Sequence, residues 1–110
     1  MKKINILKNN RDFDRIIKNN IPFKTKYYII YKERTDLSNY HFGISVSKKI
    51  GNAVTRNLYK RRIRSIIDKN NYQNNFNCII ILKKSVLEAE FSELEKDLVN
   101  ALKKINLIKE

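Results

Sequence analysis

The spacing of apolar residues along the chain alternates between two periods. In three segments these residues recur every three or four positions, as on one face of a helix; Phe13, Ile16 and Ile17 begin the first of them. In other stretches apolar and polar residues alternate, or apolar residues run on without interruption, as in strands. The pattern predicts helices over residues 10–18, 53–68 and 91–105, and strands over residues 26–34, 40–48 and 76–84.

Polar residues with capping and turn chemistry mark the ends of these segments. Asn9 or Asn10 is suited to cap the first helix, and Asn52 the second, because a short side chain accepts hydrogen bonds from the free amides of a first turn. Asn19 and Asn20, followed by Pro22, are expected to end the first helix, because asparagine tolerates the left-handed conformation that closes a helix. Gly51, in the turn before the second helix, is free to take a positive φ.

The predicted strands differ in how their apolar residues are distributed. Residues 40–48 alternate between an apolar face and a small, polar face that carries Ser45 and Ser47. Residues 76–84 are apolar on both faces, which is typical of a central strand. A break or a short extra strand is allowed between the first two strands. The order helix, two or three strands, helix, strand, helix favours an α+β sandwich with one sheet, in a single domain over residues 1–110.

The composition adds a large imbalance of charge. The 110 residues include 24 Lys and Arg against 11 Asp and Glu, a formal net charge of +13. Such self-repulsion opposes folding and is tolerated when a polyanionic partner neutralises it. Nucleic acid is the first candidate partner. A membrane is disfavoured, because no apolar run approaches the roughly 20 residues of a spanning helix.

The positive charge is concentrated between residues 43 and 65, a stretch without any acidic residue. On a helical wheel of residues 53–68, apolar residues form a seam and basic residues form a wall beside it. A solvated helix face normally mixes charges of both signs, so this wall indicates a bound polyanion, and arginine suits phosphate because its guanidinium matches the oxygens. The seam is Tyr59, Ile63 and Ile66, and the basic wall is Arg56, Lys60 and Arg64 with Asn57 and Arg61 beside it, while Arg62 points towards Leu58.

The acidic residues gather elsewhere. Five of them occur close together near the start of the last predicted helix, namely Glu88, Glu90, Glu93, Glu95 and Asp97. This side of the protein is therefore expected to face away from the polyanion, which favours an oriented complex over nonspecific coating.

A second surface carries aromatic and aliphatic residues. Aromatic faces flanked by small polar groups and cations suit a single nucleic-acid strand, because bases stack on the rings. Composition alone favours ordinary core packing for the same residues, so both interpretations stay open at this point. The residues are Phe13, Ile17, Ile29 and Tyr31, with Ser45 and Ser47.

The chain offers no catalytic constellation of its own. His41 is the only histidine and is expected to be structural or partly exposed. Cys78 lies in an apolar run and is expected to be an inert buried thiol; a single cysteine cannot form an internal disulfide, which favours a reducing cytoplasm. No glycine-rich phosphate loop is present, and no protein metal site is expected.

The stretch "FGISVSKKIGNAVTRNLYKRRIRS" resembles the signature of the bacterial ribonuclease P protein subunit. In that family a strand ends in Val-Ser-Lys-Lys and is followed by a Gly-Asn-Ala-Val turn and an Arg-Asn-Arg helix. The segments "NNRDFDRIIKNN", "YYIIY" and "CIIIL" resemble the family's first helix and two of its strands. The resemblance covers residues 7–107.

The resemblance implies a fold and a function. The fold would be a two-layer α/β sandwich in the order α-β-β-β-α-β-α, with a roughly four-stranded sheet and a left-handed β-α-β crossover, like domain 2 of ribosomal protein S5. The enzyme removes the 5′ leader of precursor tRNA, with the catalytic centre and the Mg²⁺ chemistry in its RNA subunit. The protein would be a cytoplasmic monomer in a 1:1 complex with that RNA, without a membrane partner.

The resemblance also assigns residues. Contact with the RNA subunit or the substrate junction is implied for Lys48, Lys49, Asn52, Arg56, Asn57, Lys60, Arg61, Arg62 and Arg64. A cleft for the leader is implied for Phe13, Ile17, Ile29, Tyr31, Ser45 and Ser47. The chain departs from the family pattern at Leu58, which replaces the second arginine of the triplet, at Ile17, where an aromatic residue is common, and at Asn20, near a common glycine. The alternative functions are a small ribosomal or RNA-chaperone protein and a DNA-binding regulator.

Overall fold

The computed structural model describes residues 1–109. Its helices and strands follow the expected order, and the three long helices agree with the predicted bounds to within one residue at each end. The elements are η1 (Lys3–Asn5), α1 (Asn10–Asn19), β1 (Phe23–Lys24), β2 (Tyr28–Arg34), β3 (His41–Ser45), α2 (Ala53–Asp68), β4 (Phe76–Leu82), η2 (Lys84–Glu88) and α3 (Phe91–Lys104). None of the helices in residues 1–109 combines the length and the apolar character needed to cross a bilayer.

The four strands form one mixed sheet in the order β1-β2-β4-β3. Strand β4 pairs antiparallel with β2 and parallel with β3, so the prediction of a central position for this apolar strand is confirmed. The extra short strand is β1, which pairs with β2 at its N-terminal side, through Phe23 and Ile30. The sequence analysis allowed a short extra strand between residues 26–34 and 40–48, whereas β1 precedes both of these segments. Parallel neighbours β3 and β4 are joined by α2, and the left-handed sense of that crossover and the likeness to ribosomal protein S5 stay predictions.

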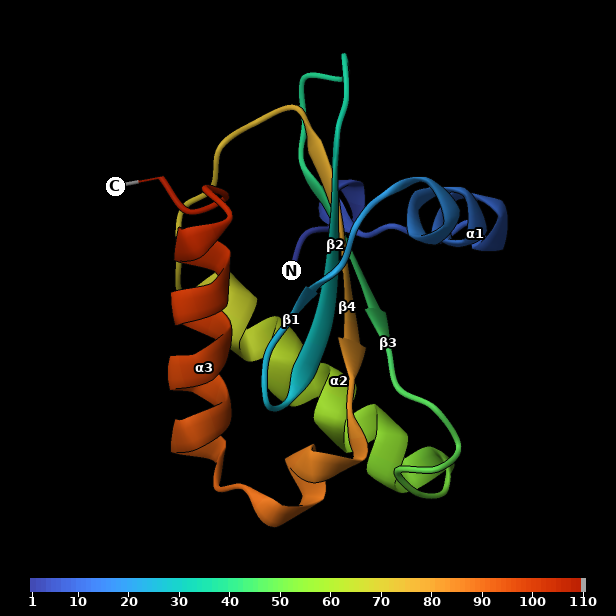
Figure 1. Cartoon of the computed structure of the whole chain (residues 1–110), viewed down its shortest axis with the longest axis vertical. Helices are drawn as coiled ribbons and strands as arrows, with labels where there is room; N and C mark the ends of the chain where they lie inside the picture. The colour runs from blue at the N-terminus through green and yellow to red at the C-terminus, as the bar shows by residue number, and fades with distance from the viewer. Residues whose placement is uncertain (110) are drawn as a thin grey trace.

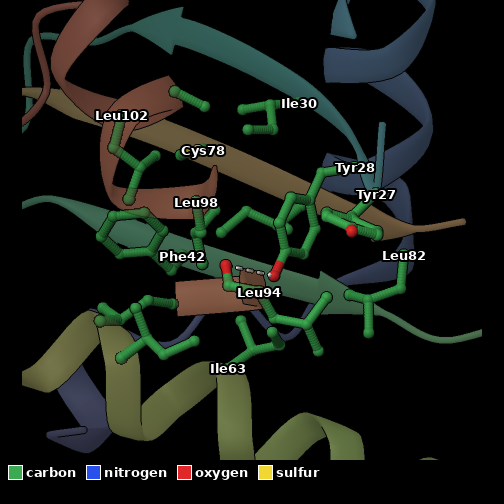
Figure 2. Packing of buried hydrophobic residues seen from close by; sticks show 14 of the residues in the cluster. Tyr27, Tyr28, Ile30, Phe42, Ile63, Cys78, Leu82, Leu94, Leu98 and Leu102 are labelled. Carbon is green, nitrogen blue, oxygen red and sulfur yellow. Dashed lines mark hydrogen bonds between the residues drawn. The ribbon is translucent and has the colours of Figure 1, made fainter. Parts of the chain in front are cut away.

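The main core lies between one face of the sheet and the helices α2 and α3 (Figure 1). This face carries Tyr28, Ile30, Phe42 and Cys78, whose side chains pack against apolar residues of both helices (Figure 2). The Tyr28 hydroxyl donates a hydrogen bond of 2.9 Å to the carbonyl oxygen of Leu94. Removing these side chains from water is the main source of stability, and it anchors the seam of α2 while its basic wall stays outside.

Helix α1 lies on the opposite face of the sheet (Figure 1). Ile16 of this helix and Ile79 of β4 are fully buried there. The Arg15 guanidinium donates a 2.7 Å hydrogen bond to Glu33 of β2, and Glu33 also accepts one of 3.0 Å from the side chain of Asn77. Apolar packing at the centre and this polar network at one end hold α1 against the sheet.

The acidic residues of α3 have a structural role in addition to their charge. Glu93 accepts a 2.8 Å hydrogen bond from the hydroxyl of Tyr27, and Asp97 accepts one of 2.6 Å from the hydroxyl of Thr25. The bond to Glu93 raises the pKa of Tyr27. These contacts clamp the turn between β1 and β2 to α3, on the side of the molecule away from α1 (Figure 1).

The helix ends confirm the predicted N-caps and correct the prediction of a left-handed helix end. Asn9 caps α1 and Asn52 caps α2, each accepting a hydrogen bond from a backbone amide of the first turn. Asn20 has a φ of −129°, so the left-handed conformation was wrong; its side chain instead donates a 2.8 Å hydrogen bond to the carbonyl of Ile16. Gly51 does not have a positive φ either.

Gly51 allows the backbone of the turn to lie close to the Thr55 side chain. An added Cβ would lie 2.9 Å from two carbon atoms of the Thr55 side chain in the first turn of α2. The turn before the basic helix therefore lies so close to α2 that a side chain at position 51 would have to displace Thr55.

Candidate nucleic-acid interface

The basic wall on α2 is confirmed as an uncompensated surface. Arg56, Lys60 and Arg64 are half-buried, and within residues 1–109 none of them takes part in a salt bridge. The Nε atom of Arg64 is buried and has no hydrogen-bond partner among the described residues. A partly desolvated guanidinium without a partner binds an incoming phosphate more strongly than a fully hydrated one does.

The neighbouring cations are held in different ways. One guanidinium nitrogen of Arg56 lies 3.4 Å from the carbonyl oxygen of Gly51, so this side chain folds back towards the turn. The Arg62 guanidinium lies 5.5 Å from the ring centre of Tyr59, in a cation–π contact. Lys48 and Lys49 are exposed in the turn before α2. Together they extend the positive surface from the wall to the turn.

Asn52 and Leu58 differ from the cations around them. The side-chain oxygen of Asn52 accepts a 3.0 Å hydrogen bond from the amide of Thr55, so its direct role is to begin α2. Leu58 is half-buried and provides no charge at the family's second arginine position. Arg62, one turn further along, lies on the same side of the helix as Leu58.

A cleft of about 770 Å³ lies between α1, the edge of β3 and α2. Phe13 and Ile17 from α1 and Ser45 from β3 line it, together with Lys60 and Arg64 from the basic wall. The two surfaces that the sequence predicts separately therefore meet in one cleft. Its remaining walls include Ile6, Leu7 and Lys8 from the N-terminal segment, and Phe42, Ile44 and Val46 from β3 and the loop after it.

Phe13 is positioned by a glycine in the sheet. The ring lies directly on Gly43 of β3, so closely that an added Cβ would be 2.4 Å from the Cζ atom of Phe13. Any other residue at position 43 would push the ring away from the sheet. The cleft wall thus depends on one close contact between α1 and β3.

The other predicted cleft residues lie outside these walls. Ile29 and Tyr31 of β2 are half-buried and on the same sheet face as Phe13. The register places Tyr31 opposite Ile79 of β4, and Ile79 opposite Gly43 of β3, so one strand separates Tyr31 from the cleft edge. Ser47 is exposed in the turn beyond β3, whereas the prediction placed it in the strand.

A second hollow, of about 550 Å³, lies on the outer side of α2. Lys60 and Arg64 line both hollows, so they form the ridge between them. Asn57 and Arg61 line the second hollow, and the exposed side chain of Val54 adds an apolar patch. The basic wall can therefore contact one nucleic-acid segment on each side.

Sequence reasoning did not identify several residues of the cleft. Asn10 and Asp14 line it from α1, and Lys8 lines it from the N-terminal segment. Asn10 and Asp14 are four residues apart, as are Phe13 and Ile17, so a full wheel of α1 would have placed both pairs on one side of the helix. Lys8 precedes any periodic pattern and had no comparable signal.

The side chain of the single histidine contacts a neighbouring side chain of the sheet, and the single cysteine is buried. His41 Nδ1 lies 2.9 Å from the side-chain oxygen of Asn77, next to the network that holds α1. Burial raises the pKa of the Cys78 thiol, which is typical of a structural cysteine. Within residues 1–109, no three His, Cys, Asp or Glu side chains are grouped closely enough to hold a metal ion.

Comparison with known proteins identifies the family. A family model described as Ribonuclease P matches residues 1–106. The ribonuclease P protein component of Streptococcus pneumoniae (strain CGSP14) is 37% identical over 112 residues, which cover 100% of this chain and 91% of that protein. The chain belongs to the ribonuclease P protein family.

Solved structures of the family have the same fold. The ribonuclease P protein of Staphylococcus aureus superposes with a TM-score of 0.85 at 29% identity, over 96% of this chain and 98% of the other. The protein from Thermotoga maritima superposes with a TM-score of 0.79 at 26% identity, over 89% and 94%. The predicted family and fold class are therefore confirmed.

Membership of the ribonuclease P family also establishes the role of the chain. The family provides the protein component of an endoribonuclease that processes the 5′ end of tRNA, and catalysis belongs to the RNA subunit. The structure offers this component a basic wall and a cleft beside it. The ribosomal, chaperone and DNA-binding alternatives are not needed to explain the basic wall.

Proposed function

We propose that the basic wall on α2 binds the RNA subunit of ribonuclease P, and that the cleft beside it holds the 5′ leader of precursor tRNA. The observation that carries this proposal is that Lys60 and Arg64 line both the cleft and the outer hollow. A ridge of two cations with space on either side suits two neighbouring RNA segments, because it neutralises phosphates of both.

The RNA subunit is assigned to the outer side of α2. That side has the hollow with Asn57 and Arg61 and continues to the turn with Lys48 and Lys49, all of which are exposed. A structured RNA presents a continuous row of phosphates, and exposed cations on a helix and its preceding turn match such a row. Arg62 and Asn52 support this surface from the side of α2 and from its N-cap.

The leader is assigned to the cleft because a single strand needs both charge and apolar surface. Phe13 and Ile17 offer an apolar row on which a base can lie, and Lys60 and Arg64 offer contacts to its phosphate. From Ser45 the sheet face continues over Ile81 to Ile29 in one register row, and Tyr31 follows in the next row. We assign this face to further leader nucleotides.

Mg²⁺ is assigned to the RNA subunit and the substrate. The protein provides no grouped ligands for it among residues 1–109; its cations lower the repulsion between two RNAs, a task that Mg²⁺ otherwise performs. We further propose that residues 1–110 act as one RNA-binding domain, with one protein per RNA subunit. The complex is expected to work in the cytoplasm, where its RNA subunit and substrate are made.

The test is a reconstitution with bacterial ribonuclease P RNA and precursor tRNA at low Mg²⁺. The protein should lower the Mg²⁺ concentration needed for cleavage and tighten binding of the precursor. The protein should tighten binding of mature tRNA, which has no leader, only slightly. If the protein changes neither the Mg²⁺ requirement nor precursor binding, the proposed function is wrong; if it tightens precursor and mature tRNA equally, the assignment of the cleft to the leader is wrong.

A further inference from the structure

Helix α1 presents two parallel rows of side chains to the cleft. Phe13 and Ile17 form an apolar row, and Asn10 and Asp14 form a polar row beside it. The members of each row are four residues apart, so both rows run along the same side of the helix. A base lying against the apolar row would therefore have its edge near the polar one.

Asp14 stands out among the residues of this cleft. Among the described residues it is the only carboxylate that lines the walls, and the charged residues beside it are the cations Lys8, Lys60 and Arg64. Asp14 is exposed, and in the described part of the chain it has no salt bridge. Asp12, on the same helix, is paired with Arg15 at 3.3 Å. The Asp14 carboxylate is thus free to contact a ligand.

A free carboxylate is unfavourable next to phosphate, because the two charges repel each other. Its favourable partners in a single RNA strand are hydrogen-bond donors, since an ionised carboxylate only accepts hydrogen bonds. The unpaired edge of guanine offers two parallel donors, N1–H and the N2 amino group, which match the two carboxylate oxygens. Uracil offers one N–H, and a ribose 2′-hydroxyl offers one O–H without regard to sequence.

We propose that Asp14 is a specificity-determining residue of the cleft, which accepts two hydrogen bonds from an unpaired guanine in the leader. Phe13 and Ile17 contact the face of the same base, and Lys60 and Arg64 hold a neighbouring phosphate. Asn10, one turn earlier on the polar row, offers both a donor and an acceptor to the adjoining nucleotide. The proposal rests on the assignment of the cleft to the leader and adds a base preference to it.

The experiment measures binding of precursor tRNA to the reconstituted holoenzyme. An all-uridine leader serves as the reference, and one guanine is placed at each leader position in turn. A leaderless tRNA is included, so that the contribution of the leader itself is known. Wild-type protein is compared with Asp14→Asn, which changes an exposed side chain, and with Asp12→Asn, which removes the same charge from the same helix outside the cleft.

The proposal predicts that guanine at one leader position tightens binding to the wild-type holoenzyme by roughly 5- to 100-fold, as a bidentate pair to a base does. Asp14→Asn should abolish this preference and bind the all-uridine leader at least as well, because a repulsive charge is gone. Asp12→Asn should keep the preference. A change in phosphate contacts alone cannot produce this pattern, because contacts to phosphate do not depend on the base.

Three results would overturn the proposal. The first is a wild-type holoenzyme that binds leaders tightly without favouring guanine at any position. The second is a guanine preference that Asp14→Asn leaves intact. The third is a guanine preference that Asp12→Asn abolishes as fully as Asp14→Asn does, which would show that the charge of α1, and not the carboxylate in the cleft, is responsible. If wild-type protein binds leader-bearing and leaderless tRNA equally, the leader assignment fails first, and that outcome is separately visible.

Discussion

The contact between Gly43 and Phe13 allows a sharp test of how the cleft wall is built. In Gly43→Ala the new Cβ would lie 2.4 Å from Cζ of Phe13 and 2.9 Å from Cε2. Carbon atoms in ordinary contact are about 3.5 to 4.0 Å apart, so the ring must retreat by roughly 1 Å or swing out of the cleft. Overpacking of this kind costs about 1 to 3 kcal/mol.

The sign of the effect is as informative as its size. Gly43 lies within β3 and has no positive φ, so its backbone conformation is open to alanine. Without the clash, Gly43→Ala would stabilise the protein by about 0.4 to 1 kcal/mol, because alanine restricts the unfolded chain. We therefore expect Gly43→Ala to be destabilising in the wild-type background and neutral or stabilising in a Phe13→Ala background.

Two measurements follow from this double-mutant cycle. Urea unfolding gives the free energy of unfolding of the wild type, both single variants and the double variant. Precursor tRNA binding to the holoenzyme, with and without a leader, gives the contribution of the cleft; a displaced ring should cost leader-dependent binding up to the stacking contribution of about 1 to 3 kcal/mol. Equal effects of Gly43→Ala in both backgrounds would refute the reasoning, since the clash requires the ring.

Three further predictions test other parts of the structure. Replacing Arg56, Lys60 and Arg64 with alanine should flatten the salt dependence of RNA-subunit binding by about 0.7 to 0.9 log units of slope per lost phosphate contact. The control, replacement of Lys96, Lys103 and Lys104 on α3, should leave the slope unchanged. An unchanged slope for the first set would show that the basic wall is not part of the interface. Tyr31→Ala should weaken binding of leader-bearing precursor by about 1 to 3 kcal/mol if a base stacks on the ring, and equal losses for mature tRNA would contradict this assignment. Burial raises the pKa of Tyr28 above the value of about 10 expected in the unfolded chain. The contribution of the neutral hydroxyl to the free energy of unfolding is therefore fully present below pH 10 and is lost as the pH rises further. In urea unfolding, Tyr28→Phe should lose less stability between neutral and alkaline pH than the wild type, and an identical loss in both proteins would argue against this.

Much of the fold could be predicted because local signals agreed with each other. Residues 53–68 combine a cap at Asn52 with a regular apolar seam, and α2 has those bounds. The apolar run of β4 has no polar face, and only the centre of the sheet buries both faces. By contrast, β1 has only two residues, too few to show any periodicity in the sequence. It is a strand only because it pairs with β2.

The candidate site was harder to predict because it depends on which strands are neighbours. Alternation along the chain shows that Tyr31 and Ser45 each lie on a definite face, but it does not show that β4 separates the two strands. The sheet order places Ser45 at the cleft and Tyr31 two strands away. Gly43 illustrates the same limit, because its need for a missing Cβ arises from Phe13, thirty positions earlier in the chain.

The most direct test of the central claim is to map what lies in the cleft of the working holoenzyme. Cys78 is buried, so Ile17→Cys introduces a thiol that can be labelled selectively with a photo-crosslinker. In the complex with the RNA subunit and precursor tRNA, the crosslinks should fall on leader nucleotides and disappear with mature tRNA. Crosslinks that fall mainly on the RNA subunit, or that persist with mature tRNA, would contradict a cleft for the 5′ leader between α1 and α2.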